Sequence, residues 1–443
     1  MFVNKMKRIK LQDLILFVLF ILISFFSVYY IYSNGLNNPP IRSDGFGYYS
    51  YLTSIFIDNN LSFHTAIMNM HTPDKAAYGL HYIEETGHFL NKYTIGTAIL
   101  QIPTFLIGHL FANIFNYTAD GYSLPYQIAN ISSGIIYCLL GMYFLYRTLL
   151  IFFEKEIALF TIVIFLFATS LFHYATYDSS FSHVYSFFLI SLFSYIIFKK
   201  FKILDINTSI LLGIIFGLIV ITRIPNAILL ILCLLFFIPY IKLSIYGEKK
   251  FIHINFNKDF FYKIFLFSLI ALAIISIQLI YWYYAAGSIF INSYKGESFN
   301  FLDPEIFNYL FSVRKGLFFW SPVLLFSILG FFILIYKKQY YIAFPILSIF
   351  LIHVYVSSSW WSWYFGGSFG NRPTVDILSL LALPFAAFIK WIMQYFCKSS
   401  IYIIGGGFIA LNIIFMFGYW KGYIPFDGTT IDIILELPVR LFG

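Results

Sequence analysis

Long apolar runs alternate with short polar segments along this chain, which is the pattern of a protein that crosses a membrane repeatedly. A helix needs about 20 apolar residues to cross the hydrocarbon core of a bilayer. By this measure the sequence predicts eleven transmembrane helices, at 12–33, 124–146, 157–173, 182–198, 207–222, 224–241, 262–285, 316–336, 339–356, 374–395 and 400–420.

The lysine and arginine positions predict an orientation for these spans, because cytoplasmic loops carry an excess of positive charge. Four cations precede the first apolar run, so we expect a cytoplasmic N-terminus and an uncleaved first helix. Alternation from there puts every later lysine-rich loop in the cytoplasm. These loops carry Arg147 and Lys155; Lys199, Lys200 and Lys202; Lys242, Lys249, Lys250 and Lys258; Lys337 and Lys338; and Lys390 and Lys398.

The apolar segment 94–116 is long enough to span, but counting it as a span would move all later lysine clusters outside. Pro103, Gln101 and His109 interrupt its apolar character and suit a helix that lies in the interface or dips into protein. We therefore predict that it does not cross. The chain is then one transmembrane domain, 1–443, with a long outer loop at 34–123 and a short outer tail at 421–443.

The composition indicates a membrane protein, and in a membrane protein a positive net charge reflects orientation rather than nucleic-acid binding. The chain is 60% hydrophobic and only 11% charged, which excludes an ordinary soluble domain. Its net charge of +8 is accounted for by orientation, so we expect no nucleic-acid partner. The bias toward Phe, Ile, Tyr, Lys and Asn is typical of an AT-rich bacterial genome. The predicted location is therefore the bacterial inner (plasma) membrane.

The titratable residues that orientation does not require collect in the predicted outer segments, so we expect any chemistry on the extracytoplasmic side. The outer segments are 34–123, 174–183, the turn at Arg223, 286–315 and 357–372. Their titratable residues include Asp44, His81, Glu84, Glu85, His88, Lys92, Asp178, His183, Arg223, Lys295, Arg314, Lys315 and Arg372.

The segment "IRSDGFGYYSYL" places Arg42 and Asp44 where the first span leaves the bilayer. Gly45 and Gly47 permit a tight turn or a close approach to a ligand. Asp44 is either an N-cap of a helix whose first turn begins near Tyr48 or a functional carboxylate.

Two further segments carry cations at the predicted outer surface. "HFLNKYTIG" contains Lys92 and Tyr93, and this lysine either reaches lipid headgroups or holds one lipid phosphate. Arg372 follows "WWSWYFGGSFGN" and either pairs with Asp376 or clamps a phosphate with its planar fork. The aromatic residues before it, which include Trp361 and Tyr364, suit an interfacial belt or a sugar and isoprenoid site equally well.

The sequence "HYIEETGH" offers one possible metal site. His81 and Glu85, and likewise Glu84 and His88, are four residues apart, as zinc ligands on a helix are. Gly79 and Gly87 favour a short hairpin as much as a helix. We expect a solvated loop or substrate contacts here, with no metal and no cofactor.

One carboxylate among cations at a membrane surface suits transfer from a polyprenyl-phosphate sugar. The leaving phosphate is already a stable anion, so it needs cations rather than an acid. The acceptor hydroxyl needs a base, and one carboxylate suffices. Glycosidases differ, because their leaving alkoxide must be protonated by a second carboxyl group.

The chain resembles the GT-C superfamily of membrane glycosyltransferases, such as the protein O-mannosyltransferases and the lipid A aminoarabinose transferase. The resemblance rests on "RSDGFGYY", "NKYTIGTAIL", "YATYDSSFSHVYSF", "WYFGGSFGNRPTVD" and "SVRKGLFFWSP", and it extends over most of the chain. It implies an all-α GT-C-like bundle of about eleven transmembrane helices, with interfacial helices in the first outer loop.

The resemblance also implies roles for single residues and an inverting reaction. Asp44 is the expected general base, and Lys92, Arg372 and Tyr93 are expected on the donor phosphate. Other expected substrate contacts are Asp178, His183, His88, Trp361, Tyr364 and Arg42. The partners are then a polyprenyl-phosphate sugar and an acceptor hydroxyl on a glycan, lipid or protein.

A membrane transporter or a flippase for lipid-linked sugars is the alternative function. Transporters generally show internal repeats and polar groups near the membrane midplane. Here Gln278, His353 and Asn412 are scattered, and the sequence shows no clear repeat between its halves.

Overall fold

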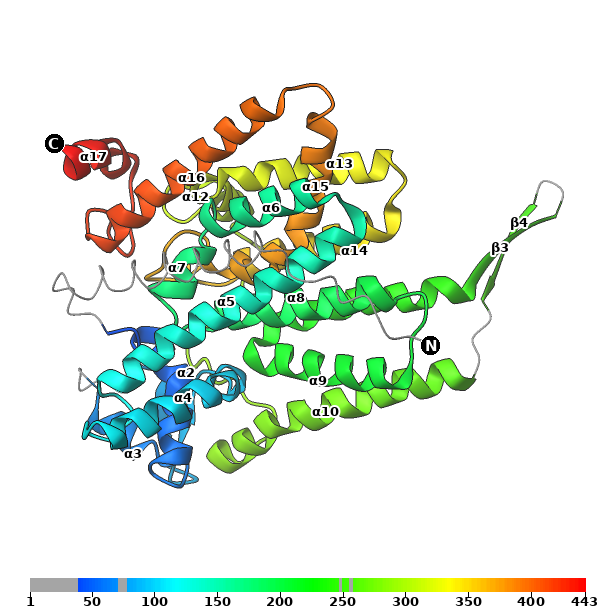
Figure 1. Ribbon diagram of the computed structural model, residues 1–443. Coiled ribbons are helices and arrows are strands. Elements are labelled where there is room, and N and C mark those ends of the chain that lie inside the picture. The colour runs from blue at the N-terminus through cyan, green and yellow to red at the C-terminus, as the bar shows by residue number, and fades with distance from the viewer. Residues whose placement is uncertain (1–38, 71–77, 247–248, 255–257) are drawn as a thin grey trace.

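The computed structural model describes residues 39–70, 78–246, 249–254 and 258–443. The predicted span 12–33 lies outside them. The structure is mainly helical, with two antiparallel hairpins, β1–β2 and β3–β4 (Figure 1). Its elements are α2 Ser43–Phe56, α3 His64–Met68, β1 Leu80–Ile83, β2 His88–Asn91, α4 Gly96–Ile114, α5 Leu124–Phe152, α6 Lys155–Phe167, α7 Leu171–Thr176, α8 His183–Lys200, α9 Ile206–Thr222, η2 Ile224–Tyr240, β3 Ile241–Tyr246, β4 Lys249–Ile254, α10 Lys258–Ala286, α11 Ile306–Phe311, α12 Leu317–Trp320, η3 Pro322–Leu324, α13 Leu325–Tyr336, α14 Tyr340–Ser358, η4 Arg372–Ile377, α15 Leu378–Ile392, α16 Lys398–Trp420 and α17 Ile431–Phe442.

Within the described residues, six helices are long and apolar enough to cross a membrane by length and composition. They are Gly96–Ile114, Leu124–Phe152, Lys258–Ala286, Tyr340–Ser358, Arg372–Ile392 and Lys398–Trp420. Three shorter apolar helices, Ile206–Thr222, Ile224–Pro239 and Pro322–Tyr336, coincide with predicted spans. The helical membrane character is thus confirmed, and the number eleven stays a prediction.

The predicted outer segments meet at one end of the helix bundle and the lysine-rich segments at the other. Helices α2, α3 and α17 lie at the left in Figure 1, and the β3–β4 hairpin projects at the right. Ion pairs join Lys390 to Glu154 and Lys398 to Glu156, which links two of the predicted cytoplasmic loops. The predicted outer and cytoplasmic segments therefore alternate between the two ends of the bundle. Which side of the membrane each end faces remains a prediction.

Two predicted spans are broken rather than continuous. The span 157–173 ends as α6 at Phe167 and resumes as the short helix α7. The side-chain amide of Asn412 donates to the carbonyl oxygens of Phe167 and Thr169, at 2.9 Å each, which satisfies backbone groups freed by the break. The span 316–336 is divided into α12, η3 and α13 at Pro322, which lacks an N–H group.

Helix α4 covers only part of the bundle length, although its length and composition would allow it to cross. The hydroxyl of Tyr137, near the middle of α5, donates to the carbonyl oxygen of Leu100 at 2.6 Å. Farther along α4, His109 bonds to Tyr126 in the first turn of α5, also at 2.6 Å. Helix α4 thus runs antiparallel to the first half of α5. This arrangement favours the prediction that the segment 94–116 enters the bundle without crossing the membrane.

The predicted tail 421–443 contains a further helix, α17, which the sequence analysis did not predict. Leu437 is buried against Gly418 of α16, where a Cβ atom would overlap the leucine side chain. Leu435 and Val439 are exposed on the same helix. A helix forms here because one face of this segment has apolar residues to bury against α16, and the outer position of the tail stays a prediction.

Labelling of single cysteines tests the course of α4. In a variant without the three native cysteines, a cysteine at Glu84 before α4 and one at Asn116 after it should react with a membrane-impermeant maleimide from the same side of the membrane. A cysteine at Lys338 should react only from the other side. Labelling of the Glu84 and Asn116 positions from opposite sides would show that α4 crosses.

Candidate functional site

The first turn of α2 packs closely against two other segments because it contains two glycines. A Cβ atom on Gly45 would overlap the Ser180 side chain, and one on Gly47 would overlap the Tyr93 ring. Both glycines lie inside the helix, so they serve close packing rather than a turn. The helix begins at Ser43, five residues before the predicted start near Tyr48.

Asp44 lies within this first turn and makes no N-cap hydrogen bond. Its Oδ2 atom is 2.8 Å from Nη1 of Arg372, and its Oδ1 atom accepts a 2.7 Å hydrogen bond from the Tyr93 hydroxyl. The N-cap interpretation is therefore wrong. The structure brings together three of the predicted site residues, one from α2, one after β2 and one at the start of η4.

Burial by itself would raise the pKa of the Asp44 carboxyl. The charge of Arg372, the Tyr93 hydroxyl and the charge of Lys92 outweigh that effect and hold this pKa below its ordinary value. Asp44 is therefore ionised at neutral pH. While Arg372 remains in contact with Asp44, the Asp44 carboxylate is also a weak proton acceptor, because the interactions that favour its negative charge oppose its protonation.

Lys92 adds a second cation beside Tyr93. Its Nζ atom is 2.5 Å from Oε1 of Glu297 and lies 4.6 Å from the centre of the Tyr294 ring. The same atom is 5.8 Å from the centre of the Tyr93 ring, whose hydroxyl bonds to Asp44. Arg372 thus contacts Asp44 and Lys92 acts on it electrostatically, and each cation is paired with a carboxylate that a bound anion could replace.

Three aspartates at this end of the bundle, Asp44, Asp178 and Asp376, have paired carboxylates that differ in exposure. The side chain of Asp44 is 27% exposed, whereas those of Asp178 and Asp376 are 6% and 2% exposed. Of these three, Asp44 is the one that a substrate hydroxyl can approach without a rearrangement of the protein.

Asp178 is occupied by a buried network. Its Oδ1 atom is 2.8 Å from Nη2 of Arg42, and its Oδ2 atom is 2.8 Å from Nε2 of His173. The indole of Trp420 donates to Nδ1 of His173 at 2.9 Å, so the proton of a neutral His173 sits on Nε2 and points at Asp178. Burial alone would raise the pKa of Asp178, but Arg42 and His173 hold it well below its ordinary value.

These contacts change the interpretation of two predicted substrate residues. Asp178 has both oxygens engaged, and Arg42 also lies 4.1 Å above the centre of the Tyr177 ring. In this structure the pair joins the residue before α2 to the turn before α8. The contacts of Asp178 are those of a positioning group, and its direct contact with substrate stays a prediction.

A second buried network contains His183 and Asp376. Nδ1 of His183 is 2.9 Å from one oxygen of Asp376, and Nε of Arg223 is 2.9 Å from the other. Asn226 also donates to this second oxygen, at 3.0 Å. The alternative pairing of Arg372 with Asp376 is therefore wrong, and buried His183 faces protein rather than an open site.

The glycine-rich segment before Arg372 is held by several contacts. The Tyr174 hydroxyl accepts from the Phe369 amide at 3.2 Å, and the buried ammonium of Lys315 donates to the carbonyl oxygen of Ser368. Gly370 has φ of +60° and lies against Trp320 and Ser170, where a Cβ atom would collide with the serine hydroxyl. This close packing explains why the segment needs glycine.

The two aromatic candidates lie in different environments. Trp361 is 56% exposed, and its amide donates to the carbonyl oxygen of Ser298 at 3.0 Å. The Tyr364 ring lies 3.3 Å below the Arg314 guanidinium, which also forms two 2.8 Å bonds to Asp427. No contact between either aromatic residue and Asp44 is found among the described residues.

The segment "HYIEETGH" forms the β1–β2 hairpin, with Ile83 opposite His88. The His88 ring stacks on Tyr284 with ring centres 4.1 Å apart, and thus packs against α10. Within the described ranges, no three His, Cys, Asp or Glu side chains are grouped so as to hold a metal ion. Among the described residues, His88 thus has contacts to α10 and none to Asp44.

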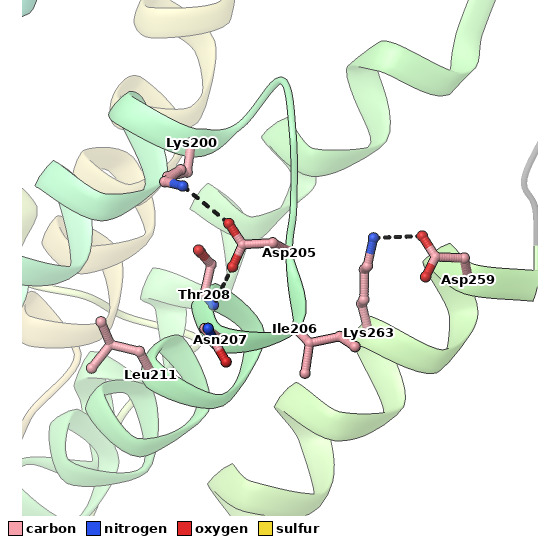
Figure 2. Close-up of a pocket in the computed structure, with 8 residues that line it drawn as sticks. All are labelled: Lys200, Asp205, Ile206, Asn207, Thr208, Leu211, Asp259 and Lys263. Carbon is pink, nitrogen blue, oxygen red and sulfur yellow. Dashed lines mark hydrogen bonds and ion pairs between the residues drawn. The ribbon is translucent and has the colours of Figure 1, made fainter. Parts of the chain in front are cut away.

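A cavity of about 720 Å³ lies at the opposite end of the bundle, between the starts of α9 and α10. Figure 2 shows that its charged walls pair with one another: Lys200 with Asp205 at 3.0 Å and Lys263 with Asp259 at 2.5 Å. Asp205 also accepts from the Thr208 amide and caps α9. These contacts are structural, and the cavity contains none of the predicted site residues.

Fold and composition define the chain as a helical membrane protein with a polar cluster at one end of its bundle. Comparison with protein families finds no family model that matches the chain. No curated protein matches it either. The GT-C resemblance therefore stays a hypothesis based on the motifs and on the geometry described above.

Several residues of the site were not among the predicted site residues. Glu297, Tyr294 and Arg223 surround the Tyr48–Tyr93 ring pair, and the Arg223 charge acts on both Tyr48 and Tyr294. Arg223 and Glu297 carried a signal, since each is a charged residue in a predicted outer segment. The sequence could not indicate which cation pairs with which carboxylate.

The different roles assigned to Asp178 and Asp44 predict different effects on stability. Asp178→Ala removes the carboxylate partner of partly buried Arg42 and should lower the free energy of unfolding by about 3 kcal/mol. Asp44→Asn keeps an oxygen that can accept from Tyr93 and should cost clearly less. Thermal unfolding in detergent checks this. Equal losses in the two variants would contradict the assignment.

Proposed function

We propose that this protein is an inverting glycosyltransferase of the GT-C type. It moves a sugar from a polyprenyl phosphate to an acceptor hydroxyl on the extracytoplasmic side of a bacterial plasma membrane. The observation that carries the proposal is that Asp44, which is more exposed than Asp178 and Asp376, contacts Arg372 and feels the charge of Lys92. Asp44 is the general base, and the two cations hold the donor phosphate.

The reaction needs few protein groups. The acceptor oxygen attacks the anomeric carbon from the side opposite the phosphate, and its proton passes to Asp44. The bond between the anomeric carbon and the phosphate oxygen breaks, and the electron pair stays on the phosphate. Arg372 and Lys92 stabilise this leaving anion, so no acid is required.

The ion pair between Asp44 and Arg372 suggests an order of events. In the free protein the guanidinium holds the carboxylate at 2.8 Å and lowers its basicity. Of the nitrogen atoms of Arg372, Nη1 bonds to Asp44, and the buried Nε has no hydrogen-bond partner among the residues that the structure describes. A donor phosphate that engages this guanidinium weakens its hold on Asp44. The base is then activated when donor is bound.

The location of the site also suits the substrates. A polyprenyl phosphate diffuses laterally in the membrane, and its charged end stays near the headgroups. Asp44 lies at one end of the bundle rather than at its middle. A donor entering from the lipid and an acceptor entering from water can therefore meet there.

Replacement of the proposed base tests the function. Asp44→Asn should lower transfer or hydrolysis of a radiolabelled polyprenyl-phosphate sugar by about 10²–10⁴-fold, because the acceptor proton loses its carrier. Donor binding should persist, since Arg372 and Lys92 remain. The measurement uses purified protein in nanodiscs with a panel of sugar donors.

A matched control is Glu84→Gln, which removes an exposed carboxylate on the β1–β2 hairpin and should leave turnover unchanged. If neither wild type nor Asp44→Asn binds any polyprenyl phosphate, and wild type instead moves a solute or lipid across liposomes, the protein is a transporter and the proposal fails.

The exchange of Arg372 between carboxylate and phosphate predicts a shift in the pH profile. In the free protein the Asp44 pKa lies below its ordinary value of 3.8, so kcat/KM for the donor should not fall as pH is lowered from 7 to 5. The acid limb of kcat, which reports the donor complex, should lie at higher pH, because Arg372 then serves the phosphate. Identical acid limbs would contradict this exchange.

A further inference from the structure

We propose that Lys315 is a positioning residue. Its ammonium group holds the carbonyl oxygen of Ser368 and thereby fixes the segment that carries Arg372 against Asp44. The positional claim rests on contacts alone, and its consequence for phosphate binding rests on the proposed function.

Lys315 contacts both sides of this segment. Its side chain donates to the carbonyl oxygen of Ser368, and its own carbonyl oxygen accepts from the Asn371 side chain at 3.4 Å. Asn371 also accepts from Thr374 at 2.7 Å, one turn into η4. The peptide from Ser368 to Asn371 is thus held at both ends by one residue, and Arg372 follows directly.

The buried position of the Lys315 ammonium group lowers the stability of the fold. Lys315 is 1% exposed, and Nζ lies 5.2 Å and 5.6 Å from the ring centres of Trp320 and Tyr419. Within the described part of the chain, no carboxylate lies within ion-pair distance of it. A buried cation without a carboxylate partner reduces stability, so its retention points to a functional role.

Burial lowers the pKa of Lys315 to about 7. The charged or titratable groups around it are Arg314 beside it in sequence, Asp427 after α16, Arg372 in the held segment, Tyr419 on α16 and His173 on α7. Asp427 favours the charge, whereas Arg314 and Arg372 oppose it. The ammonium is therefore present in mildly acidic solution and is lost as pH rises through neutrality.

The positional claim is tested by hydrogen–deuterium exchange on the full-length protein in nanodiscs, without ligand. At pH 6, backbone amides in 364–372 should exchange about tenfold faster in Lys315→Met than in wild type, because a charged hydrogen bond is lost. At pH 8.5 the difference should shrink, because wild type has lost the charge as well. Equal exchange at pH 6 would overturn the proposal.

Two further variants separate positioning from general damage. Lys295→Met removes an exposed lysine from the same outer end and should exchange like wild type. Lys315→Gln keeps an N–H donor without a charge, so its exchange should lie between wild type and Lys315→Met at pH 6 and lose the pH dependence. Should Lys315→Met fail to fold, the loss of pH dependence in Lys315→Gln decides the question.

The consequence for function is tested by binding of a polyprenyl monophosphate without sugar. At pH 6.5 its Kd should be about tenfold higher for Lys315→Met than for wild type. Titration of the phosphate affects both proteins alike, so the ratio isolates Lys315. Faster exchange with unchanged binding would refute the link to Arg372. Faster exchange with no binding by wild type would support the positional claim and refute the proposed function.

Discussion

The ion pair between Asp44 and Arg372 is the interaction on which the proposed site depends. It joins the first turn of α2 to the start of η4, more than three hundred positions later in the chain. Bringing these groups together requires Gly45 and Gly47 on one side and the tightly held 368–371 peptide on the other. The pair leaves both groups only partly exposed, so the local fold determines how strongly each charge is compensated.

Two buried networks connect the elements around the Asp44–Arg372 pair. Asp178 with His173 and Arg42, and Asp376 with His183 and Arg223, connect α7, α8 and η4 beneath the site. Their carboxylates are almost inaccessible and their partners are fixed. The protein therefore uses aspartates in two ways, and exposure distinguishes them. Asp178 and Asp376 are nearly inaccessible and orient their neighbours, whereas the Asp44 carboxylate is partly exposed.

The sequence predicted the features that depend on local pattern. Apolar runs indicated most of the helices, and the lysine distribution indicated which loops lie at the same end. The positions of the lysine-rich loops predicted that the segment 94–116 does not cross the membrane. Its contacts with α5 favour that prediction. Asp44, Tyr93 and Arg372 were chosen from separate motifs, and they are in contact.

The remaining features depend on tertiary contacts that a pattern does not encode. Asp376 is nearer to Arg372 in sequence, yet Arg372 pairs with Asp44, because the turn of η4 directs Asp376 toward Arg223 and His183. The break after Phe167 depends on Asn412 from α16. Lys315 belongs to the motif "SVRKGLFFWSP", which by itself indicated no role for it, and its burial arises only when the glycine-rich segment folds over it.

The most direct test of the central claim is a cryo-EM map of the protein in nanodiscs with a polyprenyl monophosphate bound. The account predicts phosphate density between Arg372 and Lys92, with the guanidinium turned from Asp44 toward the phosphate. Phosphate bound elsewhere, with the contact between Asp44 and Arg372 intact, would contradict the account.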